Sequence, residues 1–143
     1  MKEVFDPVRR QYVANTPEEG VRQWLIKMLS SELGYPIHLM SCEYPMDLNG
    51  KKYRADLVVF DKGAKPILIA ECKAPDVAID NEVFRQILTY NVVLRVGYIM
   101  VTNGNATFLA KVDSSTGEYS FLSTIPHYNE LLSSGLKDGL SKE

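Results

Sequence analysis

The chain has 143 residues, of which 45% are hydrophobic and 24% are charged, and its formal net charge is −2 at pH 7. This length fits one domain with a single hydrophobic core and is too short for an ATP-driven motor or an enzyme of several modules. The composition excludes disordered and fibrous classes. The slightly negative charge excludes a basic surface over the whole molecule, so any nucleic-acid binding must depend on a local patch.

The N-terminal part of the chain predicts an extended arm and then an amphipathic helix. Residues 1–15 have a mixed pattern that favours an arm with room for a short strand. Thr16 is a suitable N-cap, Pro17 suits the first helical position, and Glu19 completes a capping box. Apolar residues then recur at helical spacing until Gly34. The residues that we expect on the buried face of this helix are Val21, Trp24, Leu25, Met28, Leu29 and Leu33.

Strand-like segments follow this helix. Residues 37–44 predict a strand that Pro45 places at an edge or before a turn, and Asn49-Gly50 is a hairpin signal. Residues 53–60 and 66–73 are nearly continuous in apolar character, which indicates strands that are covered on both faces. Further along the chain we expect a helix over 81–94, strands over 97–102, 106–112 and 118–122, and a short helix over 127–132.

This order of elements predicts an α/β fold with a mixed central sheet and helices on its faces. The core order is α-β-β-β-α-β. We expect one domain over residues 1–135 and a C-terminal tail over residues 136–143. The pattern does not determine the order of the strands in the sheet.

The chain offers few signs of a special compartment. No segment reaches the roughly 20 apolar residues that span a bilayer, and the first residues lack the apolar stretch of a signal peptide. Cys42 and Cys72 have no spacing typical of a metal knuckle or a disulfide framework. We therefore expect a cytoplasmic protein without a membrane partner.

Three charged residues lie where the pattern predicts the interior of strands. Glu71 and Lys73 share one face of their strand and Cys72 takes the other, because side chains alternate. A hairpin can bring Asp56 alongside them. Each residue alone favours a structural salt bridge, but two buried carboxylates and a lysine together are costly without a further cation. Two carboxylate oxygens and a backbone carbonyl suit Mg²⁺.

The order Asp56, a turn and Glu71-x-Lys73 resembles the active site of the PD-(D/E)xK nuclease superfamily. The chain from Thr16 to about Gly104 resembles, more narrowly, the N-terminal nuclease domain of the restriction (R) subunit of type I restriction enzymes. The GxxxxGK[ST] loop of that subunit's motor is missing, so ATP hydrolysis and DNA translocation are not carried over. The matching motifs are Thr16-Pro17-Glu18-Glu19, Val21-Arg22-Gln23, Arg54-Ala55-Asp56, Glu71-Cys72-Lys73-Ala74-Pro75, Gln86 with Tyr90-Asn91, and Thr102-Asn103-Gly104.

The resemblance implies a restriction-endonuclease-like fold and a deoxyribonuclease that depends on Mg²⁺ or Mn²⁺. Asp56, Glu71 and the carbonyl group of Cys72 would hold the metal ion, which polarises the scissile phosphate and lowers the pKa of a bound water. Lys73 would position that water and offset the charge that develops on the phosphate. These roles make Asp56, Glu71 and Lys73 the predicted catalytic core.

The first helix offers two acids for the same site. A helical wheel places Glu18 near the centre of the predicted buried face, so we expect Glu18 to reach the metal-bound water. Glu19 lies off that face and is explained by the capping box. The alternative is that both are ordinary first-turn acids that complement the helix dipole. Arg22, one turn after Glu18, is predicted either to contact a phosphate or to pair with Glu18.

The second helix and the basic cluster supply the remaining candidates. Gln86 and Tyr90 are four residues apart and therefore neighbours on one helix face. In related repair nucleases this QxxxY pattern borders the site and touches the DNA backbone, and the alternative is a plain surface pair. Arg54, with Lys51 and Lys52, is predicted to contact the DNA backbone or to belong to a solvated turn.

Three functions remain open at this point. The leading hypothesis is a nuclease domain that acts on DNA and depends on Mg²⁺ or Mn²⁺ for cleavage. The alternative is a non-catalytic module that binds DNA or protein, which the net acidic charge favours because affinity for DNA depends on basic contacts. The third is a nuclease that obtains its DNA affinity from separately encoded motor or specificity subunits. DNA versus RNA, endonuclease versus exonuclease action, and a homodimer are left open.

Overall fold

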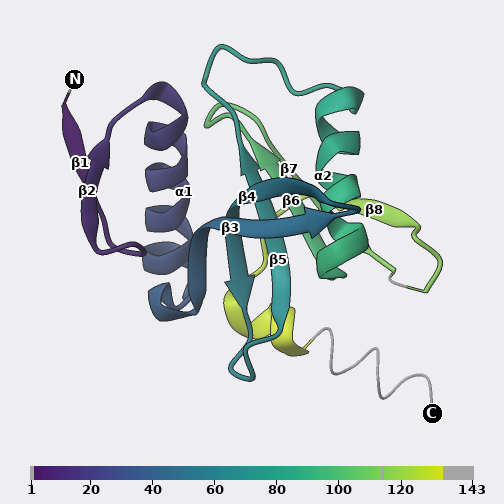
Figure 1. Ribbon diagram of the computed structural model, residues 1–143. Helices are drawn as coiled ribbons and strands as arrows, with labels where there is room; N and C mark the ends of the chain where they lie inside the picture. The colour runs from purple at the N-terminus through teal and green to yellow at the C-terminus, as the bar shows by residue number, and fades with distance from the viewer. Residues whose placement is uncertain (1, 114, 134–143) are drawn as a thin grey trace.

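The computed structural model describes residues 2–113 and 115–133. A two-stranded hairpin comes first, followed by a long helix, a six-stranded sheet interrupted by a second helix, and a last helical segment (Figure 1). The elements are β1 (Glu3–Asp6), β2 (Gln11–Ala14), α1 (Pro17–Leu33), the 3-10 helix η1 (Ile37–Leu39), β3 (Met40–Leu48), β4 (Lys51–Phe60), β5 (Pro66–Cys72), α2 (Asn81–Leu94), β6 (Tyr98–Thr102), β7 (Thr107–Val112), β8 (Tyr119–Leu122) and residues 128–133.

The main sheet is mixed, with the strand order β3-β4-β5-β6-β7-β8. Neighbouring strands are antiparallel except β5 and β6, which run parallel with Leu68 opposite Tyr98 and Cys72 opposite Thr102. The parallel pair follows from the connection, since α2 returns the chain to the starting end of the sheet before β6. The predicted α-β-β-β-α-β core is thus present, with β5 and β6 at its centre.

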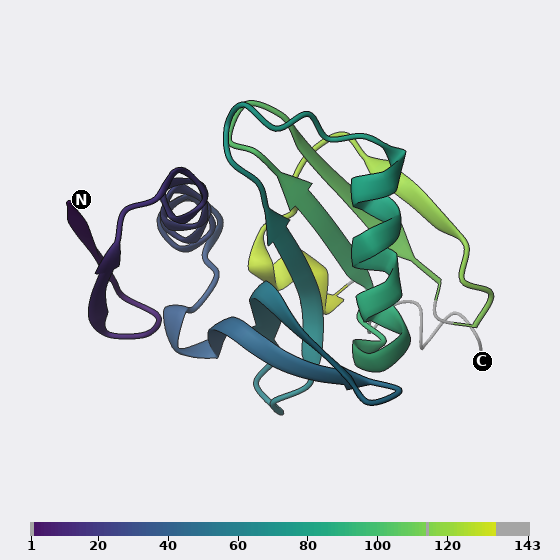
Figure 2. The ribbon, with the colours of Figure 1, turned by 45° about the horizontal axis from the view of Figure 1, so that its top comes forward.

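The two helices cover opposite faces of the sheet, and Figure 2 shows the sheet between them. Successive residues of the central strands face α1 and α2 in turn, as the continuous apolar runs of β4 and β5 predicted. On β5, Leu68 and Ala70 pack in the core that includes α1, whereas Ile69 packs in the core that includes α2. Both cores include residues of β5, and the end of this strand carries the predicted site.

Helix α1 begins and ends where the sequence predicts. The Thr16 hydroxyl oxygen accepts a hydrogen bond from the backbone N–H of Glu19, at 3.1 Å. Gly34 terminates the helix with a left-handed φ of 75°, and its N–H donates to the carbonyl group of Leu29. Glycine suits this position because it has no Cβ to oppose a positive φ.

The predicted buried face of α1 was wrong in one respect. Trp24 is 42% exposed, while Arg22 and Ile26 are buried together with Val21, Leu25 and Leu29. The helix is rotated so that the Arg22 and Ile26 side faces the sheet. Arg22 can occupy this position because carboxylate and carbonyl groups surround its guanidinium group.

Two further predictions need correction near the N-terminal half. The segment expected as an arm forms the paired strands β1 and β2, in which Phe5 lies opposite Tyr12. The strand expected from residue 37 starts at Met40, because residues 37–39 form η1. Pro45 does lie in an edge strand, as predicted, because β3 is the first strand of the sheet.

Other predictions fall on the ends of the chain. The expected helix over 127–132 is present as residues 128–133, and the strand expected over 118–122 is β8. The predicted tail, residues 136–143, lies outside the described residues. Within the described part of the chain, no helix is both long enough and apolar enough to cross a membrane.

Candidate active site

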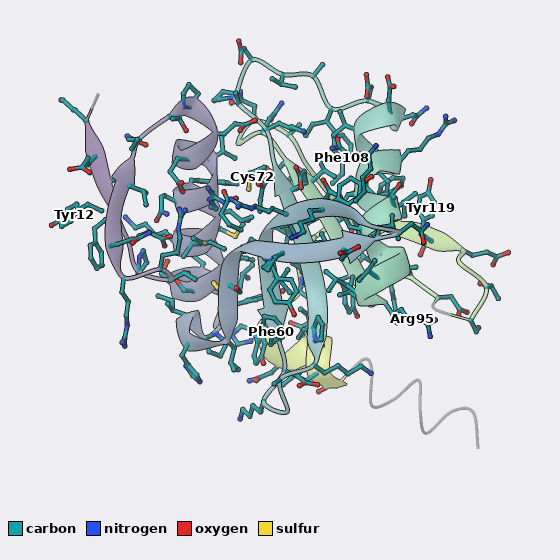
Figure 3. All side chains as sticks on the ribbon, viewed as in Figure 1. Tyr12, Phe60, Cys72, Arg95, Phe108 and Tyr119 are labelled. Carbon is teal, nitrogen blue, oxygen red and sulfur yellow. The ribbon has the colours of Figure 1, made fainter. Side chains whose placement is uncertain are left out.

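The site forms where β4 and β5 separate. The last backbone pair between these strands joins Leu57 and Ala70, so the ladder stops just before Asp56 and Glu71. The Cys72 N–H donates instead to the carboxylate of Asp56, with 2.7 Å between N and Oδ2. The Cys72 side chain packs toward α1 near the end of β5 (Figure 3). The fold therefore brings together Asp56 and Glu71, as the sequence predicted.

Asp56 and Glu71 form a pair of acids with little to neutralise them. Burial and the negative charge of Asp56 raise the pKa of Glu71 to about 8. Burial likewise raises the pKa of Asp56, although the Cys72 N–H and the charge of Arg22 oppose that rise. The Glu71 Oε2 atom is buried and has no hydrogen-bond partner among the described residues. A buried carboxylate oxygen without a donor is costly unless a proton or a cation occupies the site.

Lys73 lies on the same side of β5 as Glu71, as the alternation of side chains predicted. Its Nζ atom is 3.8 Å from Glu71 Oε1, and its side chain is partly exposed. Its backbone N–H donates to Thr102 at 2.9 Å, so β6 holds the residue in place beyond the end of the strand. At this distance the ammonium group lowers the cost of a charged Glu71 only in part.

Glu19 is the buried acid of α1, which corrects the expectation that it lies off the buried face. Its carboxylate accepts hydrogen bonds from Arg22 at 2.8 and 2.9 Å, from Arg9 at 2.7 Å and from Gln23 at 3.2 Å. Burial opposes ionisation, but these hydrogen bonds outweigh it and lower the pKa of Glu19 to about 2. The carboxylate is thus not available to return to Thr16, whose N–H bonds to Ala14, and only half of the capping box forms.

Glu18 is exposed, which corrects the expectation that it lies near the centre of the buried face of the helix, but it is close enough to the site to affect Glu71. Its charge is among the causes that raise the pKa of Glu71. It makes no ion pair among the described residues, unlike Glu19. Glu18 thus remains the predicted helical acid.

Arg22 does not have the role that the sequence suggested. It is 8% exposed and pairs with Glu19 rather than Glu18. Its NH1 atom donates to the carbonyl oxygen of Asp56 at 3.1 Å and is 3.0 Å from Glu43 Oε1. With its N–H groups directed at these partners, Arg22 is not placed to bind a DNA phosphate, and we reassign it to the support of Asp56.

Glu43 is a residue that sequence reasoning missed. It interrupts the ladder between β3 and β4, because the recorded pairs pass from Cys42–Leu57 to Tyr44–Ala55. Its φ is +53°, which is uncommon for a residue other than glycine. Its carboxylate contacts Arg22 and is 3.9 Å from Arg54. Nothing in the surrounding strand-like sequence signals this conformation.

Helix α2 borders the site from the other face of the sheet. Tyr90 is buried, and its pKa is raised by burial and by the charges of Glu71 and Asp56, so its hydroxyl group lies near the two acids. Gln86 is exposed, with its Nε2 atom 3.4 Å from the Tyr90 hydroxyl oxygen. The predicted neighbours are therefore neighbours in the structure. Arg54 is 74% exposed at its side chain and points no nearer than 3.9 Å to an acid.

The donor set fits a divalent cation that keeps much of its hydration. Asp56 and Glu71 supply two carboxylates, and the partnerless Oε2 atom of Glu71 is the observation that favours an ion there. Among the described residues, no group of three or more His, Cys, Asp or Glu side chains is arranged to hold a metal ion. The other ligands would then be a carbonyl group such as that of Cys72, water and substrate, which suits Mg²⁺.

One model of a known protein family matches most of the chain. Residues 17–126 match the family model described as the type I restriction enzyme R protein N terminus. The chain belongs to this family. The resemblance inferred from the motifs of the sequence is thereby confirmed, and the match includes every predicted site residue.

A solved structure shows the same fold. It is a fragment described as an HsdR subunit of a type I restriction enzyme from Vibrio vulnificus YJ016, with a TM-score of 0.59 and 21% sequence identity. The alignment covers 85% of this chain and 25% of that chain, so this chain spans about a quarter of the length of the R protein fragment. A search of curated proteins found no match.

Proposed function

We propose that this R-protein N-terminal domain is a deoxyribonuclease that hydrolyses phosphodiester bonds with the help of Mg²⁺ or Mn²⁺. The observation that carries the proposal is the buried Glu71 beside the half-buried Asp56, because one carboxylate oxygen of Glu71 has no hydrogen-bond partner among the described residues. A structural ion pair would give that oxygen a donor. A metal site needs it free.

The residues of the chain would divide the work as follows. Asp56, Glu71 and the Cys72 carbonyl group would hold the ion, which when bound polarises the scissile phosphate and lowers the pKa of water. Lys73 would orient the attacking water through its Nζ atom and stabilise the charge that develops on the phosphate. Glu18, exposed at the start of α1, would accept a hydrogen bond from the same water.

Contacts to the DNA backbone would come from the open side of the site. Gln86 and the Tyr90 hydroxyl group would hold the strand beside the two acids, and the exposed Arg54 would bind a phosphate further along. These residues offer few basic contacts for tight binding to DNA, since each neutralised phosphate adds to the affinity. We therefore propose that separately encoded motor or specificity subunits of a restriction-modification system bring the DNA to the domain.

The proposal can be tested on supercoiled plasmid and on linear duplex DNA. The purified protein should nick or cut the DNA with Mg²⁺ or Mn²⁺ and leave it intact with EDTA, and an RNA substrate tests the choice of nucleic acid. Asp56→Asn should abolish cutting, whereas Glu32→Gln, which changes an exposed acid of α1, should not. A wild-type protein that binds DNA but never cuts it, alone or with its partner subunits, would favour the non-catalytic binding module instead.

A further inference from the structure

Arg22 connects the first helix to the strand that carries Asp56. The NH1 atom donates to the Asp56 carbonyl oxygen at 3.1 Å and lies 3.9 Å from the Oδ1 atom of the same residue. On its other side, the guanidinium group forms a fork with both carboxylate oxygens of Glu19. One buried cation thus contacts the main chain of Asp56 and lies near its carboxylate.

Asp56 needs such support because its strand partner has ended. The ladder between β4 and β5 stops at Leu57 and Ala70, so Asp56 is the first residue of β4 beyond the paired region with β5. On the other side of β4, the ladder between β4 and β3 is interrupted at Glu43. Two other hydrogen bonds therefore replace backbone pairing at Asp56. The Arg22 side chain donates to the Asp56 carbonyl oxygen, and the Cys72 N–H donates to the Oδ2 atom of the Asp56 side chain.

A second layer of contacts holds Arg22 in turn. The Arg9 NH2 atom donates to Glu19 Oε1 at 2.7 Å, and Arg9 is itself bound by Asp6, which is fully buried at the end of β1. The five side chains form one continuous series of charged contacts from the N-terminal hairpin to the predicted metal ligand. The members of this series, here called the Arg22 network, are Asp6, Arg9, Glu19, Arg22 and Asp56.

The Arg22 network is expected to add little net stability to the fold. Ion pairs in the interior lose much of their attraction to desolvation, and apolar residues of similar volume often stabilise as well or better. A series of charge-assisted hydrogen bonds that includes the Arg22–Glu19 fork does, however, define the position of each group much more narrowly than apolar packing. Here the series ends at Asp56 of the proposed metal site, whose carbonyl oxygen accepts the hydrogen bond and whose carboxylate lies 3.9 Å from Arg22.

We propose that Arg22 is a positioning residue that presets Asp56 for the cation, and that Glu19 and Arg9 hold Arg22 in the required orientation. The β1–β2 hairpin is then part of the support of the active site. This inference rests on the proposed function, because it assigns Arg22 to the same cation site. It makes Arg22 neither a DNA contact nor a catalytic residue.

Three roles of Arg22 predict different effects on cation affinity. If Arg22 acted only through its charge, then removing it would strengthen the binding of a cation, since a competing positive charge is lost. If it served only the fold, then the melting temperature would fall and the affinity of the folded protein would not change. If it positions Asp56, then the affinity falls, and loss of a residue that orients a metal ligand typically costs 10- to 100-fold.

The decisive experiment is calorimetric titration of the full chain with Mn²⁺ alone, well below the melting temperature of each variant. Arg22→Gln and Glu19→Gln should each weaken Mn²⁺ binding about tenfold or more. Lys27→Gln is the matched control, because it removes one positive charge from an exposed position on the same helix, and it should bind as the wild type does. If Arg22→Gln fails to fold, Glu19→Gln and Arg9→Gln carry the test.

A second measurement needs no metal. The Cys72 N–H bonds to Asp56 Oδ2, whereas the neighbouring Lys73 N–H bonds to Thr102. Hydrogen exchange followed by NMR should show faster exchange at Cys72 in Arg22→Gln, with the Lys73 amide as internal reference. A general loss of stability would speed both amides alike.

The outcomes separate this inference from the proposed function. Variants that bind Mn²⁺ as tightly as the wild type, or more tightly, overturn the positioning role and leave the nuclease proposal standing. Equal exchange changes at Cys72 and Lys73 also overturn it. A wild type that binds no Mn²⁺ defeats the proposed function, and the exchange measurement then still decides whether Arg22 positions Asp56.

Discussion

Glu19 and Glu71 are both buried glutamates, yet their carboxyl groups ionise at very different pH. The pKa of Glu19 is lowered to about 2, because arginine donors more than offset its burial, and the pKa of Glu71 is raised to about 8, because burial and Asp56 act in the same direction. The surroundings rather than the residue type decide the charge state. This contrast marks Glu71 as a group that the fold alone does not stabilise.

The raised pKa of Glu71 predicts how the metal-free protein responds to pH. Between the ordinary value of 4.5 and about 8, the folded state holds a proton on this group that the unfolded state has released. Its contribution to stability therefore falls as pH rises through this window. Glu71→Gln should remove that contribution. The melting temperature of the variant minus that of the wild type should therefore be larger at pH 8 than at pH 5. Thermal denaturation in EDTA measures this, with Glu32→Gln as control. An unchanged difference at the two pH values would contradict the assignment.

Substitution of Lys73 distinguishes a catalytic role of this residue from a structural one. Its Nζ atom is 3.8 Å from Glu71 and partly exposed, so the fold does not depend on it as on a fully buried partner. Lys73→Ala should keep or strengthen Mn²⁺ affinity and leave DNA binding intact, while the rate of plasmid nicking falls by at least about 100-fold, the scale of losing one electrostatic stabiliser. Lys62→Ala, at an exposed turn, serves as control. Nicking at the wild-type rate in Lys73→Ala would end the mechanism proposed for this residue.

At the scale of elements, α1 delivers two acids to two different places. Thr16 caps the helix, and the first turn then leaves Glu18 exposed, with its charge acting on Glu71, and places Glu19 in the Arg22 network. The start of the helix therefore determines where both carboxylates lie. A shift of this start by one residue would place a different residue at each of these two positions.

The cap of α1 can be tested by removing its hydroxyl group. Thr16→Ala should lower the free energy of unfolding by about 1 kcal/mol, because the backbone N–H of Glu19 loses its partner at the helix start. Urea denaturation followed by circular dichroism gives this value. Thr16→Ser keeps the hydroxyl group and should remain within a few tenths of a kcal/mol of the wild type. Equal stability of the alanine and serine variants would show that the cap contributes nothing.

At the scale of the whole molecule, the site lies where two cores and two helices meet at the end of β5. α1 and its network reach Asp56 from one face of the sheet, and Tyr90 of α2 approaches the same acids from the other face. A cation bound here would connect β4 and β5 at the point where their backbone pairing has ended. Metal binding should therefore stabilise the complete fold.

Melting of the whole domain measures that effect. A ligand that binds only the folded state stabilises it by about 2.7 kcal/mol at a concentration 100 times its Kd. Mn²⁺ or Mg²⁺ should accordingly raise the melting temperature of the wild type, and EDTA should reverse the rise. Asp56→Asn should show no shift. Absence of any shift in the wild type at millimolar metal would count against the metal site.

The local elements of this protein could be predicted because short-range physics specifies them. The cap at Thr16 and the stop at Gly34 bounded α1, the continuous apolar runs indicated the doubly covered strands β4 and β5, and the alternation of side chains placed Glu71 and Lys73 together. The motif order identified the family without any coordinates. All of these signals lie within a few residues of one another or follow from the order along the chain.

Only the tertiary structure decided which groups these elements bring into contact. By itself the amino-acid sequence determined that Asp56, Glu71 and Lys73 could form a site, but it indicated neither the burial of Glu19 nor its fork with Arg22, because Arg9 and Asp6 come from a hairpin that had no recognisable pattern. The same holds for Glu43, whose left-handed backbone coincides with the break in the ladder between β3 and β4. A buried charge is tolerated only where partners from distant segments surround it, and those partners exist only once the chain has folded.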